Sequence, residues 1–201
     1  MDRFQIRQAC SVVIGGAKMD KPTIVNVAGK AKHGKDTFAD YLADKLYEDY
    51  GKKVQKIAFA DAVKKKARKI GWDGEKDQNG RALLQFVGTE WGRQQIDKDI
   101  WIMKAERKIH GNTDVVVFTD TRFLNEITYF IMGGYKVMPI KLIRLNEEGN
   151  EWDNGMDDTL KQHSSETQID NYPFPRTVRH NTLEELKNQT EIIANGMMQN
   201  V

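Results

Sequence analysis

Gly29-Lys30-Ala31-Lys32-His33-Gly34-Lys35-Asp36-Thr37 is the stretch that decides the fold of this chain. It has the G-x-x-x-x-G-K pattern of phosphate-binding loops, with Asp36 where those loops usually have Ser or Thr. Gly29 and Gly34 allow the chain to curl so that backbone N–H groups point inward, and Lys35 can reach the β- and γ-phosphates of a nucleotide. The sequence therefore predicts a bound nucleoside triphosphate.

The segments on both sides of this loop favour that prediction. Residues 23–28 have the composition of a short apolar strand, and residues 38–46 repeat apolar side chains at helical spacing. A phosphate-binding loop requires this order of strand, glycine loop and helix. The alternative is a surface turn, rich in glycine and lysine, that binds no ligand.

The other loop residues have expected roles around the phosphates. In the common loop a hydroxyl at the position of Asp36 ligates Mg²⁺, so this carboxylate is expected to ligate the metal or to hold one of its waters. Thr37 would supply a hydroxyl close to the α-phosphate. Lys32 and His33 complete the expected cofactor-binding set, and the expected cofactors are ATP and Mg²⁺.

Strand and helix patterns alternate along the rest of the chain. Further strands are predicted at 54–59, 115–119, 136–145 and, more weakly, 177–180. Helices are predicted at about 35–50, 61–70, 81–96, 100–109 and 122–132, with a last helix from about 183. This alternation predicts an α/β fold, a doubly wound parallel sheet of about five strands.

The chain is expected to form one domain over residues 1–201, because its length suits a single core. Residues 60–112 lack a strand pattern, and we expect a helical substrate-binding insertion there. Residues 146–175, rich in Asn, Asp, Gly and Glu, predict a mobile lid, with an ordinary surface loop as the alternative. Near the start of the chain, the apolar patch at 10–14 predicts an extra strand or a loosely docked arm.

The composition of the chain limits the cellular compartments and the binding partners that we expect. Cys10 is the only cysteine, which excludes an internal disulfide, and the longest apolar runs are too short to span a bilayer. These features favour the cytoplasm, that of a host cell if the protein is viral. The net charge of +2 does not indicate a nucleic-acid partner, and the basic run at 64–69 is interpreted as a solvated helix face. Small nucleotides are the expected partners, while nucleic acid and a homodimer stay open.

Asp120-Thr121-Arg122 directly follows the predicted strand at 115–119. Its side chains are expected at the carboxyl edge of the sheet, the same edge as the glycine loop. Asp120 would hold Mg²⁺ through water, and Arg122 would grip a second phosphate with both arms of its guanidinium group. The alternative is that Asp120 caps a helix beginning near Arg122.

A second group of candidates lies in the expected insertion. Gly88 and Gly92 are unfavourable inside a helix, each by about 1 kcal/mol relative to Ala, so we expect something to approach the backbone there. A nucleobase stacked near Trp91, with Arg93 on its phosphate, is one interpretation, and a core-facing tryptophan beside a bend is the other.

Other candidates have weaker support. Trp101 is expected in the core, and Lys104 either contacts a ligand or is solvated. In the expected lid, His163 and Glu166 would contact phosphate or metal, with plain solvation as the alternative.

In this order the motifs resemble the deoxynucleoside monophosphate kinases of tailed bacteriophages, a branch of the P-loop kinases. The resemblance covers residues 23 to about 190, and it rests on these features: Gly34-Lys35-Asp36-Thr37, Ala60-x-x-x-Lys64, Leu84-x-x-x-Gly88-Thr89, Trp101-x-x-Lys104, Asp120-Thr121-Arg122, Arg144 at the end of a strand, His163-x-x-Glu166, and Asn181 before a helix. Two features depart from the family pattern. Ala62 stands where members often have proline, and no arginine lies between Leu145 and Pro175.

The resemblance implies transfer of the γ-phosphoryl group of ATP to the phosphate of a deoxynucleoside monophosphate. The implied catalytic residues are Lys35, Asp120, Arg122 and Arg144, and the implied metal ligands are Asp36 and Asp120. The implied substrate-binding residues are Lys64, Gly88, Thr89, Trp91, Arg93, Lys104, Arg122, His163 and Glu166. Two alternatives stay open: a P-loop kinase that phosphorylates a hydroxymethylated base in DNA, and a nucleotide-dependent ATPase or switch without kinase activity.

Overall fold

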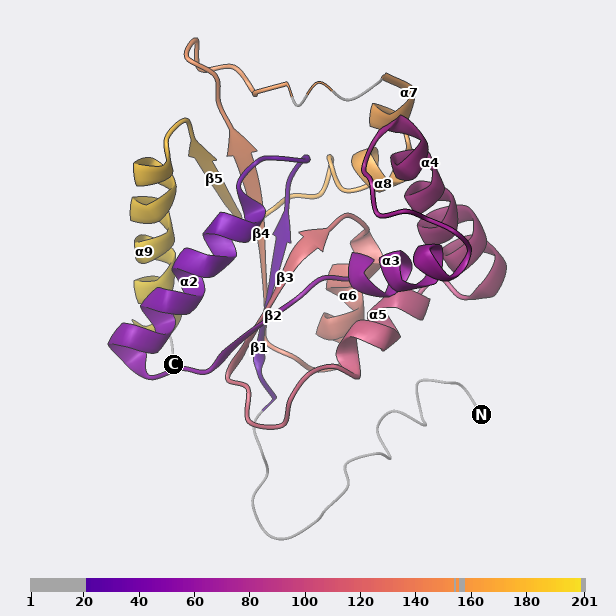
Figure 1. Cartoon of the computed structure of the whole chain (residues 1–201). Helices are drawn as coiled ribbons and strands as arrows, with labels where there is room; N and C mark the ends of the chain where they lie inside the picture. The colour runs from indigo at the N-terminus through magenta and orange to yellow at the C-terminus, as the bar shows by residue number, and fades with distance from the viewer. Residues whose placement is uncertain (1–20, 154, 156–157, 200–201) are drawn as a thin grey trace, which may run out of the picture.

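A five-stranded parallel sheet forms the centre of the molecule, in a computed structural model that describes residues 21–153, 155 and 158–199 (Figure 1). The strand order is β2-β3-β1-β4-β5, and every neighbouring pair is parallel. The strands are β1 (Thr23–Ala28), β2 (Val54–Ile57), β3 (Val115–Thr121), β4 (Val137–Arg144) and β5 (Arg176–His180). The predicted α/β class and parallel sheet are confirmed, whereas the predicted strand or arm at 10–14 lies outside the described residues.

Side chains alternate between the two faces of this sheet, and helices cover both faces. Val25 and Val27 of β1 pack in one core with α2 (Lys35–Tyr50) and α9 (Leu183–Gln199). Ile24 packs in a second core with residues of two other helices, α5 (Ile100–Glu106) and α6 (Leu124–Met132). Figure 1 shows α2 and α9 on one side of the sheet and α5 and α6 on the other. Burial on both faces explains why the strands are nearly continuous apolar runs.

The central strand β1 positions the functional edge of the sheet. It lies between β3 and β4, with Ile24 opposite Val116 on one side and opposite Val137 on the other. The amide of buried Asn26 donates a 3.1 Å hydrogen bond to the Thr121 hydroxyl and so joins the ends of β1 and β3. Because parallel strands end at the same edge, residues 29–37 lie beside the end of β3.

Two element boundaries near this edge differ from the sequence prediction. β3 continues past residue 119 to Thr121, which still pairs with Ala28 of β1. Asp120 therefore belongs to the strand rather than to the segment after it. The following helix, α6, begins at Leu124 and not near 122, because its cap residue Phe123 has an extended backbone.

The segment between β2 and β3 is helical in the described structure. It contains α3 (Ala60–Lys69), α4 (Gln78–Phe86) and η1 (Val87–Ile96), followed by α5. The predicted single helix at 81–96 is wrong in form, since α4 gives way to a π-helix at Val87. Stretches of π-helix are uncommon and occur often at functional sites.

Tight packing against one tryptophan accounts for Gly92 of η1. A Cβ atom on Gly92 would lie 2.5 Å from Cζ2 of Trp101. The indole N–H of Trp101 also donates a 2.7 Å hydrogen bond to the carbonyl of Gly88. Trp101 is 2% exposed, which confirms its predicted core position. The group that approaches this backbone is therefore the Trp101 side chain.

Residues 146–175 contain two short helices that the sequence pattern did not indicate. These are α7 (Asp158–Lys161) and α8 (Ser164–Thr167), and Figure 1 shows α7 beside α4. The Gln85 side-chain amide of α4 donates a 3.2 Å hydrogen bond to the carbonyl of Leu160. This segment therefore contacts the helical insertion above the sheet.

The final helix, α9, begins at Leu183, where the sequence predicts its start. The Thr182 hydroxyl accepts a hydrogen bond from the Glu185 N–H (3.1 Å), and the Glu185 carboxylate accepts one from the Asn181 N–H (2.9 Å). α9 is 17 residues long and packs against α2. Neither α9 nor any other helix built from the described residues has the length and apolar character to cross a membrane.

Candidate active site

The glycine loop (residues 29–37) runs from β1 into α2 with backbone angles that favour glycine at two points. The φ angles are +146° at Gly29 and +80° at Gly34. A Cβ atom on Gly29 would lie 2.5 Å from the carbonyl oxygen of Leu142 in β4. Gly34 is the cap residue of α2, and no described side chain bonds to the first N–H groups of that helix. Such N–H groups at a helix N-terminus are available to bind an anion.

Lys35 is the first residue of α2, and its ammonium group turns back onto the loop. Its Nζ donates hydrogen bonds to the carbonyl oxygens of Gly29 (2.8 Å) and Lys30 (2.7 Å). Burial, and then the positive charge of Arg122, lower the pKa of Lys35 to about 8. A phosphate beside this group would favour its charged form and raise the pKa again.

His33 joins the loop to the residues that follow β4. Its Nδ1 accepts a 3.3 Å hydrogen bond from the backbone N–H of Arg144, which leaves Nε2 to donate to the carbonyl of Trp152 at 3.2 Å. Burial lowers the pKa of this fully buried imidazole. The guanidinium of Arg144 lies over the indole ring of Trp152, 4.7 Å from its centroid. His33 therefore holds the loop in place, and Arg144 stacks beside it.

Asp120 joins the end of β3 to the start of α3. Its two carboxylate oxygens accept hydrogen bonds of 2.8 Å from the backbone N–H groups of Phe59 and Ala60. Burial raises the pKa of this carboxyl group. The alternative in which Asp120 caps the helix after it is wrong, because the helix that it caps is α3. A carboxylate has lone pairs left after two such bonds and can still accept from a ligand's water.

Glu126 of α6 organises two arginines and was not predicted from the sequence. Its carboxylate pairs with the guanidinium of Arg93, and the two side chains are 2% and 9% exposed. It also accepts hydrogen bonds from the backbone N–H groups of Arg122 (2.7 Å) and Phe123 (3.1 Å). Burial raises the pKa of Glu126 to about 7, against the opposing effect of Arg93. The sequence signal for this role was a capping-box position, because Glu126 lies three residues after Phe123 in the first turn of the helix.

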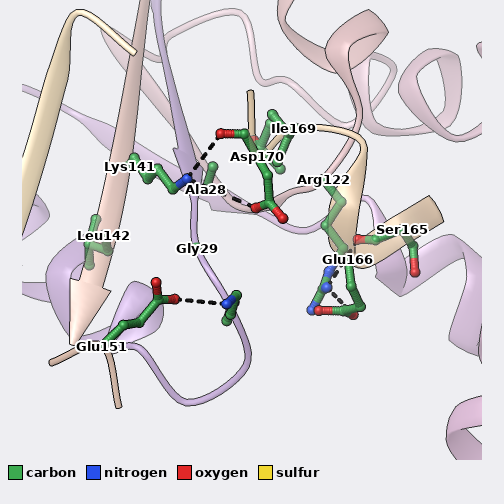
Figure 2. Close-up of a pocket in the computed structure, with 12 residues that line it drawn as sticks. Ala28, Gly29, Arg122, Lys141, Leu142, Glu151, Ser165, Glu166, Ile169 and Asp170 are labelled. Carbon is green, nitrogen blue, oxygen red and sulfur yellow. Dashed lines mark hydrogen bonds and ion pairs between the residues drawn. The ribbon is translucent and has the colours of Figure 1, made fainter. Parts of the chain in front are cut away.

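Arg122 lies between the sheet edge and α8 (Figure 2). Its Nη1 contacts the Glu166 carboxylate and donates to the carbonyl of Ser165 at 3.2 Å. The sequence predicted Glu166 as a contact for phosphate or metal, and the structure pairs it with a cation. Both side chains line the cavities on either side of them, so a phosphate that reached Arg122 would compete with Glu166.

His163 connects the helical insertion to the segment that contains α7 and α8. Its Nδ1 accepts the backbone N–H of Ser165 at 3.1 Å, so Nε2 donates to the Glu90 carboxylate at 2.9 Å. Glu90 belongs to η1, and Ser165 is the neighbour of Glu166. This contact fixes α8 next to η1, with Glu166 directed at Arg122.

These elements enclose a cleft of about 550 Å³ at the carboxyl edge of the sheet. Ten predicted site residues line it: Lys32, Lys35, Asp36, Lys64, Gly88, Thr89, Arg93, Asp120, Arg122 and Glu166. Its ionisable lining comprises seven cations (Lys32, Lys35, Lys64, Lys76, Arg81, Arg93 and Arg122) and four carboxylates (Asp36, Asp120, Glu126 and Glu166). An excess of positive charge in a cleft attracts polyanionic ligands such as nucleotides.

Several predicted residues lie outside this cleft. Gly29 lines a smaller cavity of about 170 Å³, which shares Arg122 and Glu166 with the cleft (Figure 2). Trp91 and Lys104 line a separate outer groove on the helical insertion. The remaining predicted residues that do not line the cleft are His33, Gly34, Thr37, Arg144 and His163. The structure therefore brings most, but not all, of the predicted set together.

Lys76, Arg81 and Gln85 also line the cleft and were not predicted. Arg81 and Gln85 lie one helical turn apart on α4, with Gly88 following at the next turn. Polar residues at this spacing on the cleft side of a helix were the only signal in the sequence. They extend the polar lining away from the glycine loop.

Comparison with known proteins gives one informative match. No protein-family model matches this chain. A stretch of 47 residues is 49% identical to the deoxynucleoside-5'-monophosphate kinase of Escherichia phage T5. This alignment covers 23% of the present chain and 19% of the length of that enzyme. The similarity to that enzyme is therefore local, and it covers less than a quarter of either chain.

Proposed function

We propose that this protein is a deoxynucleoside monophosphate kinase that converts ATP and a deoxynucleoside monophosphate into ADP and a deoxynucleoside diphosphate. The observation that carries the proposal is the cleft, which Lys35 and Asp36 line together with Arg93 and Arg122. Phosphoryl transfer asks little covalent chemistry of a protein, and its rate depends on positioning and charge neutralisation. The local similarity to the phage T5 enzyme supports the same class of reaction.

The donor site in this proposal is built on the glycine loop. The free N–H groups at the start of α2 would bind phosphate oxygens, and Lys35 would exchange its bonds to the loop carbonyls for the β- and γ-phosphates. Arg144 is better suited to the donor side than to the acceptor, since its guanidinium is stacked on Trp152 next to the loop residue His33. A purine ring stacks readily on such a surface.

Mg²⁺ fits the residues of the cleft as an ion that arrives with the phosphates. This ion usually takes one or two carboxylates and keeps several waters. Asp36 is exposed and lines the cleft, while both oxygens of Asp120 already accept backbone N–H groups. Asp36 would therefore approach the ion or its waters directly, and Asp120 would hold an outer water. Among the described residues no group of three or more His, Cys, Asp and Glu is arranged as a metal cage. Bound Mg²⁺ would neutralise charge on the β- and γ-phosphates.

The acceptor phosphate would bind to Arg122 and Arg93. Among the described residues, the Arg122 guanidinium is held by the partly exposed Glu166 and one carbonyl, so a phosphate can replace Glu166. Arg93 keeps its buried partner Glu126, which fixes the direction of its guanidinium group. The two arginines thus offer one exchangeable and one fixed positive charge. Such groups align an acceptor for in-line attack on the γ-phosphate.

A product assay tests the proposal. The protein is incubated with ATP and Mg²⁺ and, separately, with each deoxynucleoside and ribonucleoside monophosphate, and the products are separated by anion-exchange chromatography. We expect a diphosphate with at least one deoxynucleoside monophosphate, and none with Lys35→Ala protein whose melting temperature is unchanged. Steady ATP hydrolysis that no monophosphate affects would contradict the proposal and favour a nucleotide-dependent ATPase.

A further inference from the structure

A second concave surface lies on the outer side of the helical insertion. It is a groove of about 490 Å³ between α3, η1 and α5, which pack against one another. The groove shares one lining residue, Trp101, with the candidate active-site cleft. We call it the outer groove. Its lining residues are Asp61, Ala62, Lys65, Lys66, Lys69, Trp91, Ile100, Trp101, Lys104 and Lys108.

The charge of the outer groove is strongly one-sided. Five of its ten lining residues are lysines and one is an aspartate, in a chain whose net charge is only +2. The aspartate, Asp61, already pairs with Lys108 at 3.4 Å. The other four lysines form no ion pair with any acidic residue in the described part of the chain. Positive charge is therefore concentrated here without a balancing partner.

The floor of the outer groove is apolar and aromatic. Trp91 is partly exposed, lies 6.5 Å from the buried ring of Trp101 and is flanked by Ile100. Lys66 lies over the Trp91 ring, 4.8 Å from its centroid. A partly exposed indole ring surrounded by lysines offers two different contacts to one ligand. It provides a face for stacking and a rim for phosphates.

We propose that the outer groove binds single-stranded nucleic acid, with a base stacked on Trp91 and the flanking phosphates on Lys65, Lys66, Lys69 and Lys104. A single strand combines a backbone of regular negative charge with bases that can leave the stack, and proteins bind it with this combination of lysines and aromatic rings. An acidic peptide would satisfy the lysines and leave the indole ring without a partner. A duplex keeps its bases paired inside, so Trp91 could not reach them.

Anisotropy of a fluorescent oligonucleotide of about 12 deoxynucleotides, within the ~4–16 nucleotides that single-strand sites cover, measures this binding. The test variant is Lys65→Glu/Lys69→Glu, which leaves the lining of the active-site cleft intact. The matched control is Arg179→Glu/Lys187→Glu, which changes two exposed cations on β5 and α9 and alters the net charge equally. Melting temperatures of both variants establish that they are folded.

Counterion release sets the expected effect of these variants. Each phosphate contact to a single strand contributes about 0.7 to the slope of log affinity against log salt, or a factor of about five at 0.1 M salt. Loss of two contacts should therefore weaken binding by about 25-fold and lower the slope by about 1.4, while the control changes affinity by less than about two-fold. Equal weakening in both variants, or no binding of the unaltered protein at low salt, would overturn the proposal.

Two competitors decide the chemistry of the ligand. A strand with abasic sites keeps the phosphates and should compete at least about five-fold less well than the intact strand, because a stacked base is lost. Polyglutamate should compete poorly for the same reason. If either polymer competes as well as the intact strand, Trp91 does not stack on a base and the outer groove is a site for acidic polymers in general.

Discussion

Replacement of Arg122 by lysine separates a phosphate-binding guanidinium group from a simple positive charge. Arg122 lines the cleft at the end of β3, and its Nη1 contacts Glu166 and the carbonyl of Ser165. Lysine keeps the charge but loses the planar fork that binds two phosphate oxygens at once. The loss of one charge-assisted hydrogen bond costs about 1.5–3 kcal/mol, which corresponds to a factor of roughly 10 to 150 in acceptor affinity.

The stability of the protein should change little in this variant. The Arg122 and Glu166 side chains are 27% and 11% exposed, and lysine can still pair with the carboxylate. Partly exposed ion pairs contribute about 1 kcal/mol or less. Arg144→Lys is the matched control, because Arg144 lies over Trp152 outside the cleft and should affect the donor instead.

Separate titrations of ATP and of the preferred monophosphate, by calorimetry and by initial rates, measure both effects. We expect Arg122→Lys to weaken only the monophosphate and Arg144→Lys to weaken mainly ATP. An equal loss for both ligands in Arg122→Lys protein, or a fall of many degrees in its melting temperature, would refute the acceptor assignment.

Three further predictions follow from the environments of single charged groups. The pKa of Lys35 is about 8 without ligand and should rise beside phosphate. ATP affinity measured by calorimetry should therefore be constant below pH 8 and fall by up to about ten-fold per pH unit above it. Lys35→Met protein should not show this dependence on pH. Because burial raises the pKa of Glu126 from 4.5 to about 7, its ionisation should lower the free energy of unfolding by up to about 3 kcal/mol as pH rises from about 4.5 to 7, and urea denaturation should show this loss in the unaltered protein but not in Glu126→Gln protein. Asp36→Ser restores the common loop residue and should keep Mg²⁺-dependent activity with a changed Mg²⁺ requirement, so an unchanged Mg²⁺ titration would exclude a metal role for Asp36.

The sheet was the most predictable part of this protein, because its strands are buried on both faces. That burial demands nearly unbroken apolar runs such as residues 115–119, which no surface element would contain. The glycine loop was equally predictable from the sequence. Gly29 is required by the carbonyl of Leu142 and by a positive φ angle, and these constraints leave a fixed spacing in the sequence.

The π-helix η1 could not be predicted, because its sequence continues the apolar spacing of α4. The change of helix type accompanies the close packing of Trp101 against Gly92, a contact between residues on different helices. The sequence left two interpretations of Trp91 open, a stacked nucleobase or a core-facing tryptophan, whereas the structure packs Trp91 against the core cluster of Trp101 with part of it lining the outer groove.

The partners of the arginines were also hidden from the sequence. Glu126 lies in the largely apolar helix α6, and only the fold reveals that it meets Arg93, 33 residues earlier in the chain. Glu166 was predicted to contact phosphate or metal. In the structure its carboxylate instead pairs with Arg122, which lies 44 residues earlier in the chain. Such pairs depend on how the insertion and residues 146–175 pack over the sheet. Sequence patterns between neighbouring residues cannot predict that packing.

The fate of the γ-phosphoryl group tests the central proposal most directly. The protein is given ATP labelled with ³²P at the γ position, Mg²⁺ and a mixture of deoxynucleoside monophosphates, and the labelled products are separated. The account predicts label in the β-phosphate of a deoxynucleoside diphosphate, and none there with Lys35→Met protein of unchanged melting temperature. Label that appears only in inorganic phosphate, or only in added DNA that contains hydroxymethylated bases, would contradict it.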